Sequence, residues 1–326
     1  MSIYLGVDGG GTNTALCLIS EDGDVLGLLD APSCYYLGAG STEGVSLVTR
    51  VLAEAVPALC TAAGTVPSQI TFAFFGLPAY GEVSADLPLL DAAPRTALGH
   101  GRYRCDNDMV CGWAGSLALE DGVNVISGTG SMSYGQRAER QVRVGGWGEL
   151  FGDEGSGYWI AVRGLKAFSH MSDGRLPAGP LVDVLREHLD LRSDLDVVDV
   201  VLNRWRGSRR DIAALSRQVV EAARRGDAVA AQVLTDAADE LVLLIQTTCR
   251  RLGFAAGEPV PVSYSGGVLS APEVLSRFEQ RLTGEDGRYD LRTPRFAPVI
   301  GAALYAAKLA RAPLATTALK RLQATV

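Results

Sequence analysis

Two glycine-rich turns, far apart along the chain, carry groups that suit a phosphate-binding site. The first is residues 8–12 (DGGGT) and the second is residues 128–131 (GTGS). Glycines let a backbone turn approach phosphate oxygens and offer them N–H donors, and the hydroxyl side chains add further donors. A glycine-rich hairpin that binds nothing can have the same sequence, so one turn alone is weakly indicative. Because both turns directly follow apolar strands, the pair predicts a clamp on one polyphosphate between two domains.

Two carboxylates lie at the ends of predicted strands, one of them in the first turn itself. Asp8 ends the first strand, where it can hold a water bound to Mg²⁺, an ion that prefers few carboxylates together with water and phosphate. Asp108 follows a short strand at 103–105 and precedes a helical segment at 110–119. A carboxylate there can accept a hydroxyl proton as a phosphoryl group moves. The alternative for Asp108 is a helix N-cap, and Asp106 is a rival for either role.

Three later segments add candidate binding groups. Trp147 has glycines on both sides, which favours an exposed ring that stacks on a sugar face over a core aromatic. Asp153 is a candidate sugar contact, whereas Glu154 is expected to cap the following helix. The turn at 265–267 (SGG) leaves room for a flat adenine, although a plain β–α turn is the alternative. The basic stretch at 204–210 is interpreted as a solvated loop.

Hydrophobic periodicity indicates the elements that would position these residues. Alternating and β-branched runs predict strands, and apolar positions spaced i, i+3, i+4 predict helices. A hairpin turn is expected at 21–24 and a helix at 45–59, which Pro57 should kink or end. The predicted strands are 3–7, 14–20, 25–30, 70–75, 103–105, 123–126, 132–135 and 260–264. Further helices are expected at 110–119, 155–170 and much of 181–252, and residues 296–301 lead into a closing helix that ends near 310.

The order of these elements repeats. A strand, a glycine–threonine turn and a second strand open the chain, and the same device returns near residue 123. We therefore expect two related α/β domains, in keeping with a chain of 326 residues. The first domain is assigned to 1–112 with a C-terminal helix at about 300–326. The second is assigned to 113–299 and contains a helical insertion.

Composition excludes several classes of function. The net charge is −7, with 47% hydrophobic and 21% charged residues, and no basic run supports binding to nucleic acid or to a membrane surface. No secretory signal or apolar run long enough to span a bilayer is visible. The six cysteines are scattered without a CxxC pair and the three histidines are far apart, so no zinc site is expected. Scattered thiols suit the reducing cytoplasm.

Taken in order, the motifs resemble those of a known family. They are DGGGT at 8–12, ND at 107–108, SGTGS at 127–131, GGWG at 145–148, GDEGS at 152–156 and SGG at 265–267. This set resembles the N-acetylglucosamine kinase and BadF/BadG/BcrA/BcrD ATPase family of the sugar kinase–Hsp70–actin superfamily. The resemblance extends from residue 3 to about residue 310. The GGWG and GDEGS segments are its most specific part, and they point toward amino-sugar kinases.

The resemblance implies a fold and an activity. The fold would be two actin-like, ribonuclease-H-like α/β domains with a nucleotide and sugar cleft between them. The activity would be ATP- and Mg²⁺-dependent phosphorylation of glucosamine or N-acetylglucosamine at the 6-hydroxyl, by a cytoplasmic homodimer. The sequence leaves the sugar open: glucosamine and N-acetylglucosamine are close competitors, and glucose and other amino sugars stand behind them.

The resemblance also implies roles for individual residues. Asp108 would be the catalytic base, and Asp8 would lie near the metal. Nucleotide contacts would come from Asp8, Gly10, Gly11, Thr12, Asn13, Gly128, Thr129, Gly130, Ser131, Gly266 and Gly267, and sugar contacts from Ser127, Gly146, Trp147, Asp153 and Tyr35. Two positions depart from the family pattern. Asn13 stands where lysine is common, and residues 33–36 (SCYY) occupy a loop that often carries a sugar-binding asparagine.

Alternatives from other classes remain. An ATP-driven activator of a partner enzyme, as BadF-type ATPases can be, would hold an iron–sulfur cluster through cysteines beside the turns. The sequence has no cysteine in such a bridging position. A sugar-sensing repressor would need a DNA-binding extension, whereas this chain opens at its first strand. A glucokinase of the repressor–kinase type would carry a cysteine-rich zinc motif, and the sequence has none. The activator is the main alternative to a kinase.

Overall fold

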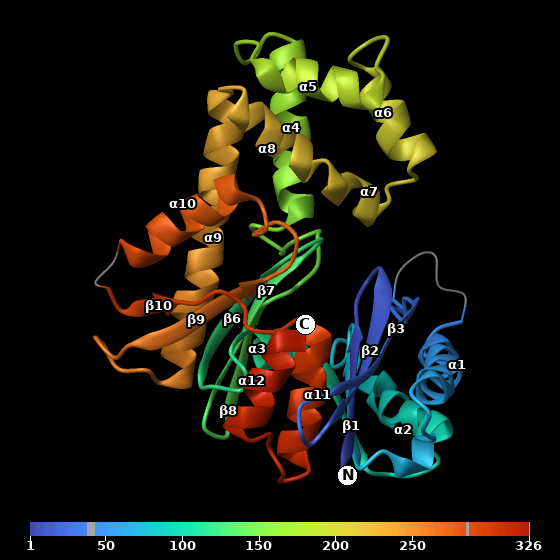
Figure 1. Ribbon diagram of the computed structural model, residues 1–326. Helices are drawn as coiled ribbons and strands as arrows, with labels where there is room; N and C mark the ends of the chain where they lie inside the picture. The colour runs from blue at the N-terminus through green and yellow to red at the C-terminus, as the bar shows by residue number, and fades with distance from the viewer. Residues whose placement is uncertain (38–42, 285–286, 326) are drawn as a thin grey trace. The chain divides into compact units, whose positions relative to one another are not determined.

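Each of two units in the computed structural model is built on a five-stranded sheet (Figure 1). The structure describes residues 1–37, 43–284 and 287–325. Unit 1 comprises residues 1–120 and 293–326, and unit 2 comprises residues 121–292. The boundaries between the units fall at 120/121 and 292/293, whereas the sequence predicted them at 112/113 and about 299/300.

The sheet of unit 1 has the strand order β3-β2-β1-β4-β5. Its strands are β1 (Ile3–Gly9), β2 (Asn13–Ser20), β3 (Val25–Pro32), β4 (Phe72–Leu77) and β5 (Tyr103–Asn107). β1 to β3 form an antiparallel meander, and β4 and β5 run parallel to β1. The carboxyl ends of β1, β4 and β5 therefore meet at one edge of the sheet.

Helices cover this sheet. They are α1 (Ser46–Ala62), α2 (Leu87–Leu98), α3 (Met109–Ser116), α11 (Pro298–Leu309) and α12 (Thr316–Thr325), with short 3₁₀ turns at Pro67–Gln69 and Ser84–Asp86. α3 and α11 approach closely, since a side chain on Gly301 would meet the backbone N of Gly115 at 2.1 Å. This packing explains why the boundary between the units lies after α3 and not within it.

The prediction that Pro57 would end or kink the first helix was wrong in its stronger form. α1 continues through Pro57 to Ala62. Its buried face is uninterrupted, with Leu52 before the proline and Leu59 after it, both at most 1% exposed. Packing of that face compensates for the hydrogen bond that proline cannot donate.

The sheet of unit 2 repeats the pattern of unit 1. Its order is β10-β9-β6-β7-β8, and its strands are β6 (Gly122–Ser127), β7 (Ser131–Arg137), β8 (Arg140–Gly145), β9 (Val260–Ser265) and β10 (Tyr289–Leu291). β6 to β8 are antiparallel, and β9 is parallel to both β6 and β10. The expectation of two related α/β units, each headed by a glycine hairpin, is confirmed.

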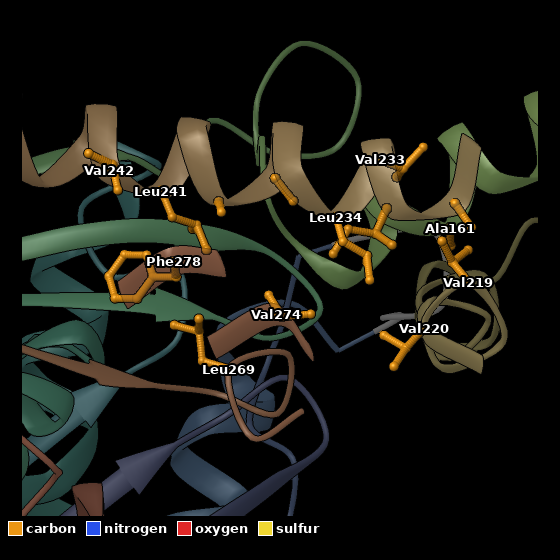
Figure 2. Packing of buried hydrophobic residues seen from close by; sticks show 14 of the residues in the cluster. Ala161, Val219, Val220, Val233, Leu234, Leu241, Val242, Leu269, Val274 and Phe278 are labelled. Carbon is orange, nitrogen blue, oxygen red and sulfur yellow. The ribbon is translucent and has the colours of Figure 1, made fainter. Parts of the chain in front are cut away.

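Unit 2 also carries a large set of helices. They are α4 (Gly157–Ser172), α5 (Pro180–Leu189), α6 (Asp196–Asp199), a π-helical turn (Val200–Arg204), α7 (Arg209–Ala214), α8 (Ser216–Arg224), α9 (Ala228–Leu252) and α10 (Pro272–Thr283). Figure 2 shows how α9 lines the core with Leu234 and Leu241, facing Val274 and Phe278. No helix in the described part of the chain is long and apolar enough to cross a membrane.

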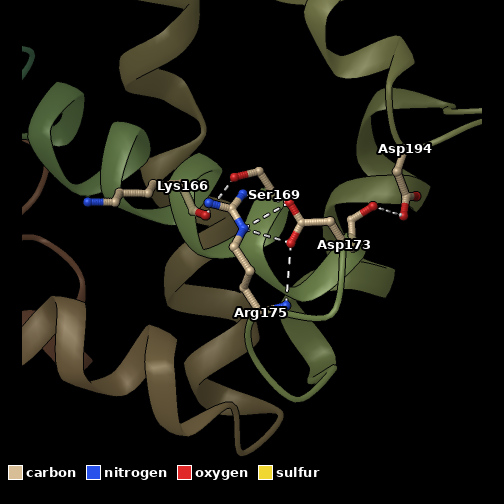
Figure 3. Close-up of polar contacts among 6 residues, drawn as sticks. Lys166, Ser169, Asp173, Arg175 and Asp194 are labelled. Carbon is tan, nitrogen blue, oxygen red and sulfur yellow. Dashed lines mark hydrogen bonds and ion pairs between the residues drawn. The ribbon is translucent and has the colours of Figure 1, made fainter.

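Polar contacts secure the outer end of α4. In Figure 3 the guanidinium of Arg175 lies on the carboxylate of Asp173, with Nε–Oδ1 at 2.8 Å. Ser172 Oγ donates to Asp194 at 2.6 Å, and Arg186 Nε donates to the same carboxylate at 2.7 Å. These bonds tie α4 and α5 to the segment before α6.

Candidate active site

Asp8 lies at the carboxyl edge of the unit 1 sheet. It pairs with Ala15 of β2 on one side and with Gly76 of β4 on the other. The α-carbon of Asp108 is 3.1 Å from the position that a Cβ on Gly76 would take. Gly76 thus leaves the space in which the start of α3 approaches the end of β1. Both carboxylates predicted from the sequence come together at this edge.

The electrostatics of Asp8 reflect that meeting. Burial and, second to it, the negative charge of Asp108 raise the pKa of Asp8 to about 7, while a hydrogen bond from the Cys111 thiol opposes the rise. Two carboxylates that share so small a volume repel each other unless a proton or a cation lies between them. The pair is therefore suited to binding a cation or exchanging a proton.

The N-cap alternative for Asp108 finds no support in the geometry. Asp108 occupies the cap position of α3, but its side chain makes no capping hydrogen bond. Asn107 Oδ1 accepts the N–H of Met109 at 3.1 Å in its place. The rival Asp106 accepts the N–H of Asn107 at 2.8 Å and lies 3.9 Å from Arg104. Asp108 is thus the carboxylate of this segment that acts on Asp8.

The first glycine turn is open on its outer side. Gly10 N donates to Asn13 O at 2.8 Å and closes the turn. Nothing lies within 4 Å of the position that a Cβ on Gly11 would take, and Gly11 and Thr12 are exposed. Gly9 is enclosed, since a Cβ there would meet Pro78 at 2.6 Å. The turn is therefore anchored at its base and accessible at its tip.

Asn13 and the loop after β3 lie beside this turn. Asn13 Nδ2 donates to Asp30 at 3.1 Å, so its amide is directed along the sheet. Ser33 Oγ donates to Gly10 O at 2.8 Å and, unforeseen from the sequence, ties the loop to the turn. Tyr35 follows, half-buried, with its N–H donated to Ser33 Oγ at 3.1 Å. The predicted sugar contact Tyr35 therefore belongs to the same cluster as the turn.

Cysteines lie nearer the first turn than the sequence suggested. Cys34 Sγ is 2.9 Å from the position of a Cβ on Gly9, and Cys111 Sγ donates to Val7 O at 3.7 Å. All six cysteines are free and buried. Burial raises the pKa of Cys34 to about 11, so the thiol stays protonated. Neither sulfur is available at the surface to bridge a cluster to a second chain.

The donor set in unit 1 fits Mg²⁺. Carboxylate oxygens are the ligands that this ion prefers, and it keeps several waters or phosphate oxygens besides one or two carboxylates. Asp8 and Asp108 supply such a pair, and a bound cation would favour the charged form of Asp8 against the burial and the Asp108 charge that raise its pKa. Among the described residues, no group of three or more histidine, cysteine or acidic side chains forms a closed metal cage.

The second glycine turn joins β6 to β7. Ser127 pairs with Ser131 across the hairpin, and Gly128 N donates to Gly130 O at 2.9 Å. In the part of the chain that the structure describes, the amides of Thr129 and Gly130 donate to no protein acceptor. Nothing lies within 4 Å of a Cβ position on Gly128. These amides are the kind of donor that a phosphate oxygen accepts from.

Hydrogen bonds to residues 154–157 fix this turn. Ser127 Oγ donates to Gly155 O at 2.8 Å and Ser131 Oγ donates to Glu154 O at 2.6 Å. Gly157 N, at the start of α4, donates to Gly128 O at 2.8 Å. Ser127, predicted to contact sugar and phosphate, is fully buried. Its hydroxyl therefore braces the turn.

Gly266 and Gly267 lie next to the same turn. β9 is parallel to β6, with Ser265 opposite Ile126. Gly266 has φ +93, and a Cβ there would approach Ser127 O to 2.3 Å, whereas Gly267 has no neighbour within 4 Å. Only glycine fits at 266, and both glycines are exposed. The structure thus brings the predicted adenosine turn beside the predicted phosphate turn.

The GGWG segment follows β8 on the other side of the hairpin. Gly145 pairs with Met132 of β7, one residue beyond the turn. Gly146 lies over Met132, whose Cε is 2.8 Å from a Cβ position on Gly146. Trp147 is 72% exposed, as its flanking glycines predicted, and Leu150 and Phe151 are also exposed, at 88% and 75%. The segment presents an apolar surface beside the turn.

Asp153 is buried against the turn and forms an ion pair. It is 3% exposed, has φ +58, and pairs with Nη2 of Arg209. Burial raises the pKa of Asp153, while Arg209 and the backbone N–H of Ser131 oppose the rise. Arg209 also lies 3.1 Å from Glu149. The interpretation of 204–210 as a solvated loop was wrong at Arg209, because α7 starts there and directs its side chain inward.

The expectation that Glu154 caps α4 was wrong. The N-cap is Ser156, whose Oγ accepts the N–H of Trp159 at 3.1 Å. Serine in this position satisfies an amide that the helix itself leaves unpaired.

A separate cavity of about 450 Å³ lies among the helices of unit 2. It is lined by Met171 of α4, by Pro180, Asp183 and Arg186 of α5, and by Arg225 after α8. None of the residues singled out from the sequence lines it. The cavity is thus unrelated to the glycine turns.

The fold and the turns define a class of α/β protein in which two related units each carry a glycine hairpin suited to phosphate. The particular family follows from comparison with known proteins. The model of the BadF/BadG/BcrA/BcrD ATPase family matches residues 5–306. This chain belongs to that family.

Named relatives cover most of the chain. It is 30% identical over 315 residues to an N-acetyl-D-glucosamine kinase from Dictyostelium discoideum, covering 93% of this chain and 97% of the relative. It is 30% identical over 272 residues to an N-acetylmuramic acid/N-acetylglucosamine kinase from Clostridium acetobutylicum, covering 83% and 86%. A solved structure of a candidate N-acetylglucosamine kinase from Chromobacterium violaceum superposes with a TM-score of 0.71 at 23% identity, covering 93% of this chain and 98% of that one. At that identity, the likeness shows a common fold.

Proposed function

We propose that this protein transfers the γ-phosphoryl group of ATP to a hydroxyl of an amino sugar. The observation that carries the proposal is the pair of carboxylates, Asp8 and Asp108, at a sheet edge beside an open glycine turn. Phosphoryl transfer needs a group that orients and deprotonates the acceptor hydroxyl, and donors that hold the phosphates. Family membership and the names of two relatives support the same reaction.

Asp108 is the proposed base. Its side chain does not cap α3, so the carboxylate can accept the proton of the attacking hydroxyl as the bond to phosphorus forms. The bond from that phosphorus to the bridging oxygen breaks, and ADP leaves with the electron pair. Catalysis of this kind depends mostly on positioning and charge stabilisation.

The two glycine turns are the proposed phosphate contacts. Gly11 and Thr12 in unit 1, and Thr129 and Gly130 in unit 2, offer amides or hydroxyls to phosphate oxygens. Gly266 and Gly267 are the proposed adenosine contacts. Asp8 would hold Mg²⁺, which supplies neutralising charge on the phosphates when it is bound.

N-acetylglucosamine and glucosamine are the proposed substrates, with the 6-hydroxyl as acceptor. The GGWG and GDEGS segments are the proposed sugar contacts, and exposed Trp147 offers a ring face for stacking. The names of the two relatives favour the N-acetylated sugar. Tyr35 stands in the loop where relatives often have asparagine, so its contribution to recognition of the acetamido group is part of the proposal.

Location and assembly are further parts of the proposal. Six free cysteines support a reducing compartment such as the cytoplasm. A homodimer follows from the family resemblance and is measurable by light scattering after size exclusion.

The deciding experiment is a coupled ADP-release assay over a panel of sugars with and without the free amine. We expect Mg²⁺-dependent ADP release with N-acetylglucosamine or glucosamine, and the phosphorylated position read by NMR. ADP release that no sugar stimulates would overturn the proposal and favour the ATP-driven activator. An iron analysis of the purified protein then tests that alternative, which requires bound iron and sulfide.

A further inference from the structure

Arg209 makes contacts that a surface arginine does not make. It begins α7, and its Nη2 lies 2.6 Å from the position that a Cβ on Gly130 would take. The same nitrogen pairs with Asp153, while Nε lies 3.1 Å from Glu149 Oε2. Arg209 thereby links α7 to the glycine turn and to the GGWG–GDEGS segment, both of which precede it by more than fifty residues in sequence.

The pairing partner of Arg209 holds the turn. The backbone N–H of Ser131, the residue at which the turn becomes β7, is one of the groups that favour the ionised form of Asp153 and so lower its pKa. Asp153 Oδ2 lies 2.8 Å from the Cβ position on Gly130. A charged carboxylate attracts an N–H group more strongly than a protonated one does. The charge of Asp153 therefore bears on the geometry of the turn.

A nearly buried carboxylate keeps its charge only with help from its surroundings. Asp153 is 3% exposed and Arg209 is 31% exposed. The charged groups that act on Asp153 are Arg209 from α7, which favours the ionised form, and Glu149 from the preceding segment, which opposes it. Without the guanidinium, burial and Glu149 both favour protonation.

The guanidinium of Arg209 also faces a second acidic side chain. Within the described residues, Nε is buried, and its ion pair with Glu149 lacks the alignment of a hydrogen bond. Arg209 therefore interacts with both Glu149 and Asp153.

From these contacts we propose that Arg209 is a positioning residue for the second glycine turn, which it fixes by holding the charged Asp153 carboxylate against Gly130. The effect on substrates is indirect. The amides of Thr129 and Gly130 keep the orientation in which they can donate to a phosphate oxygen. The inference rests on the proposed function in one respect, that this turn holds nucleotide phosphate.

The first test needs no ligand. Hydrogen–deuterium exchange on the full chain compares Arg209→Met, Arg209→Lys and the matched control Arg210→Met, whose side chain is exposed on the same helix. We expect faster exchange in a peptide covering residues 128–133 for Arg209→Met alone. Exchange that is unchanged in that variant overturns the inference, whatever the protein's activity.

The second test measures ADP affinity with Mg²⁺ by calorimetry between pH 6 and pH 9. Arg209→Met should bind ADP about tenfold more weakly at pH 6.5. The loss should shrink as pH rises, because Asp153 in that variant regains its charge only at higher pH. Arg209→Lys should retain most of the affinity. A loss that does not vary with pH, or that Lys fails to rescue, contradicts the proposal.

A double variant distinguishes loss of positioning from misfolding caused by an unpaired buried charge. Asp153→Asn combined with Arg209→Met removes both charges and leaves no unpaired buried ion. If Arg209 acts through Asp153, the double variant should match Asp153→Asn alone, with no pH dependence of ADP binding over this range. Additive losses would overturn the inference. A wild-type protein that binds no ADP, yet shows the predicted exchange differences, would sink the proposed function and leave the positioning role supported.

Discussion

The two glycine hairpins share a topology but differ in what surrounds them. The turn of unit 1 lies beside two carboxylates and a loop held by Ser33, and its tip is exposed. The turn of unit 2 is braced by the buried Ser127, by Ser131 and by the Asp153–Arg209 pair. The first hairpin thus concentrates charge that can act on a proton or a cation. The second concentrates rigidity, which suits the holding of phosphate.

The largest effect is expected on kcat, at the proposed base in unit 1. Asp108→Asn should lower kcat by about 10²–10⁴ because the base is lost, while ADP still binds. Steady-state ADP release and calorimetry measure the two quantities. Asp106→Asn is the matched control, since that carboxylate is engaged by Asn107 and Arg104. If Asp106→Asn is the slower enzyme, the assignment of the base is wrong.

The next prediction concerns the rigidity of unit 2. Gly266→Ala should destabilise the protein by about 1–3 kcal/mol or more, because alanine is strained at φ +93 and its Cβ would strike Ser127 O. Gly267→Ala should change stability by less than about 0.5 kcal/mol, since its surroundings are open. Urea unfolding measures the free energy of unfolding of both variants. Equal stability of the two variants would mean that the second turn is less constrained than its contacts indicate.

A smaller effect is expected at Trp147. Trp147→Ala should raise the KM for the sugar by about 2- to 10-fold through loss of stacking. The melting temperature should stay unchanged, because the ring is 72% exposed and packs little against the core. Phe151→Ala, exposed to 75%, is the control for a general loss of apolar surface. An equal rise in both variants would make the contact nonspecific.

The smallest effect is expected on stability, at the Asp194–Arg186 ion pair, which is more exposed than the Asp153–Arg209 pair. Arg186 and Ser172 lower the pKa of Asp194 to about 2. Because this pKa lies below that of the unfolded chain, the stabilisation is present above about pH 4 and is lost as pH falls toward 2. Asp194→Asn should cost about 0.2–1 kcal/mol at pH 7, and the variant and wild type should converge in acid. A difference that persists at pH 2 would point to packing and not to charge.

Much of the fold could be predicted from the sequence because its signals are local. Strand periods and glycine turns marked both hairpins, and the GGWG flanks correctly indicated an exposed Trp147. β8 and α2 were missed, since β8 is short and charged and α2 contains two prolines. The cap at Ser156 was assigned to Glu154 because an acidic residue near a helix start can either cap the helix or only interact with its dipole, and the sequence does not separate the two.

The sequence by itself determined the two related units, their phosphate-type turns and the candidate base, because glycine, aspartate and alternating apolar residues constrain nearby backbone. Only the tertiary structure decided which distant groups meet. Asp153 and Arg209 are 56 residues apart, and Cys111 lies 104 residues from Val7, whose carbonyl it contacts. Such contacts depend on how sheets and helices pack, and no local pattern in the chain records them.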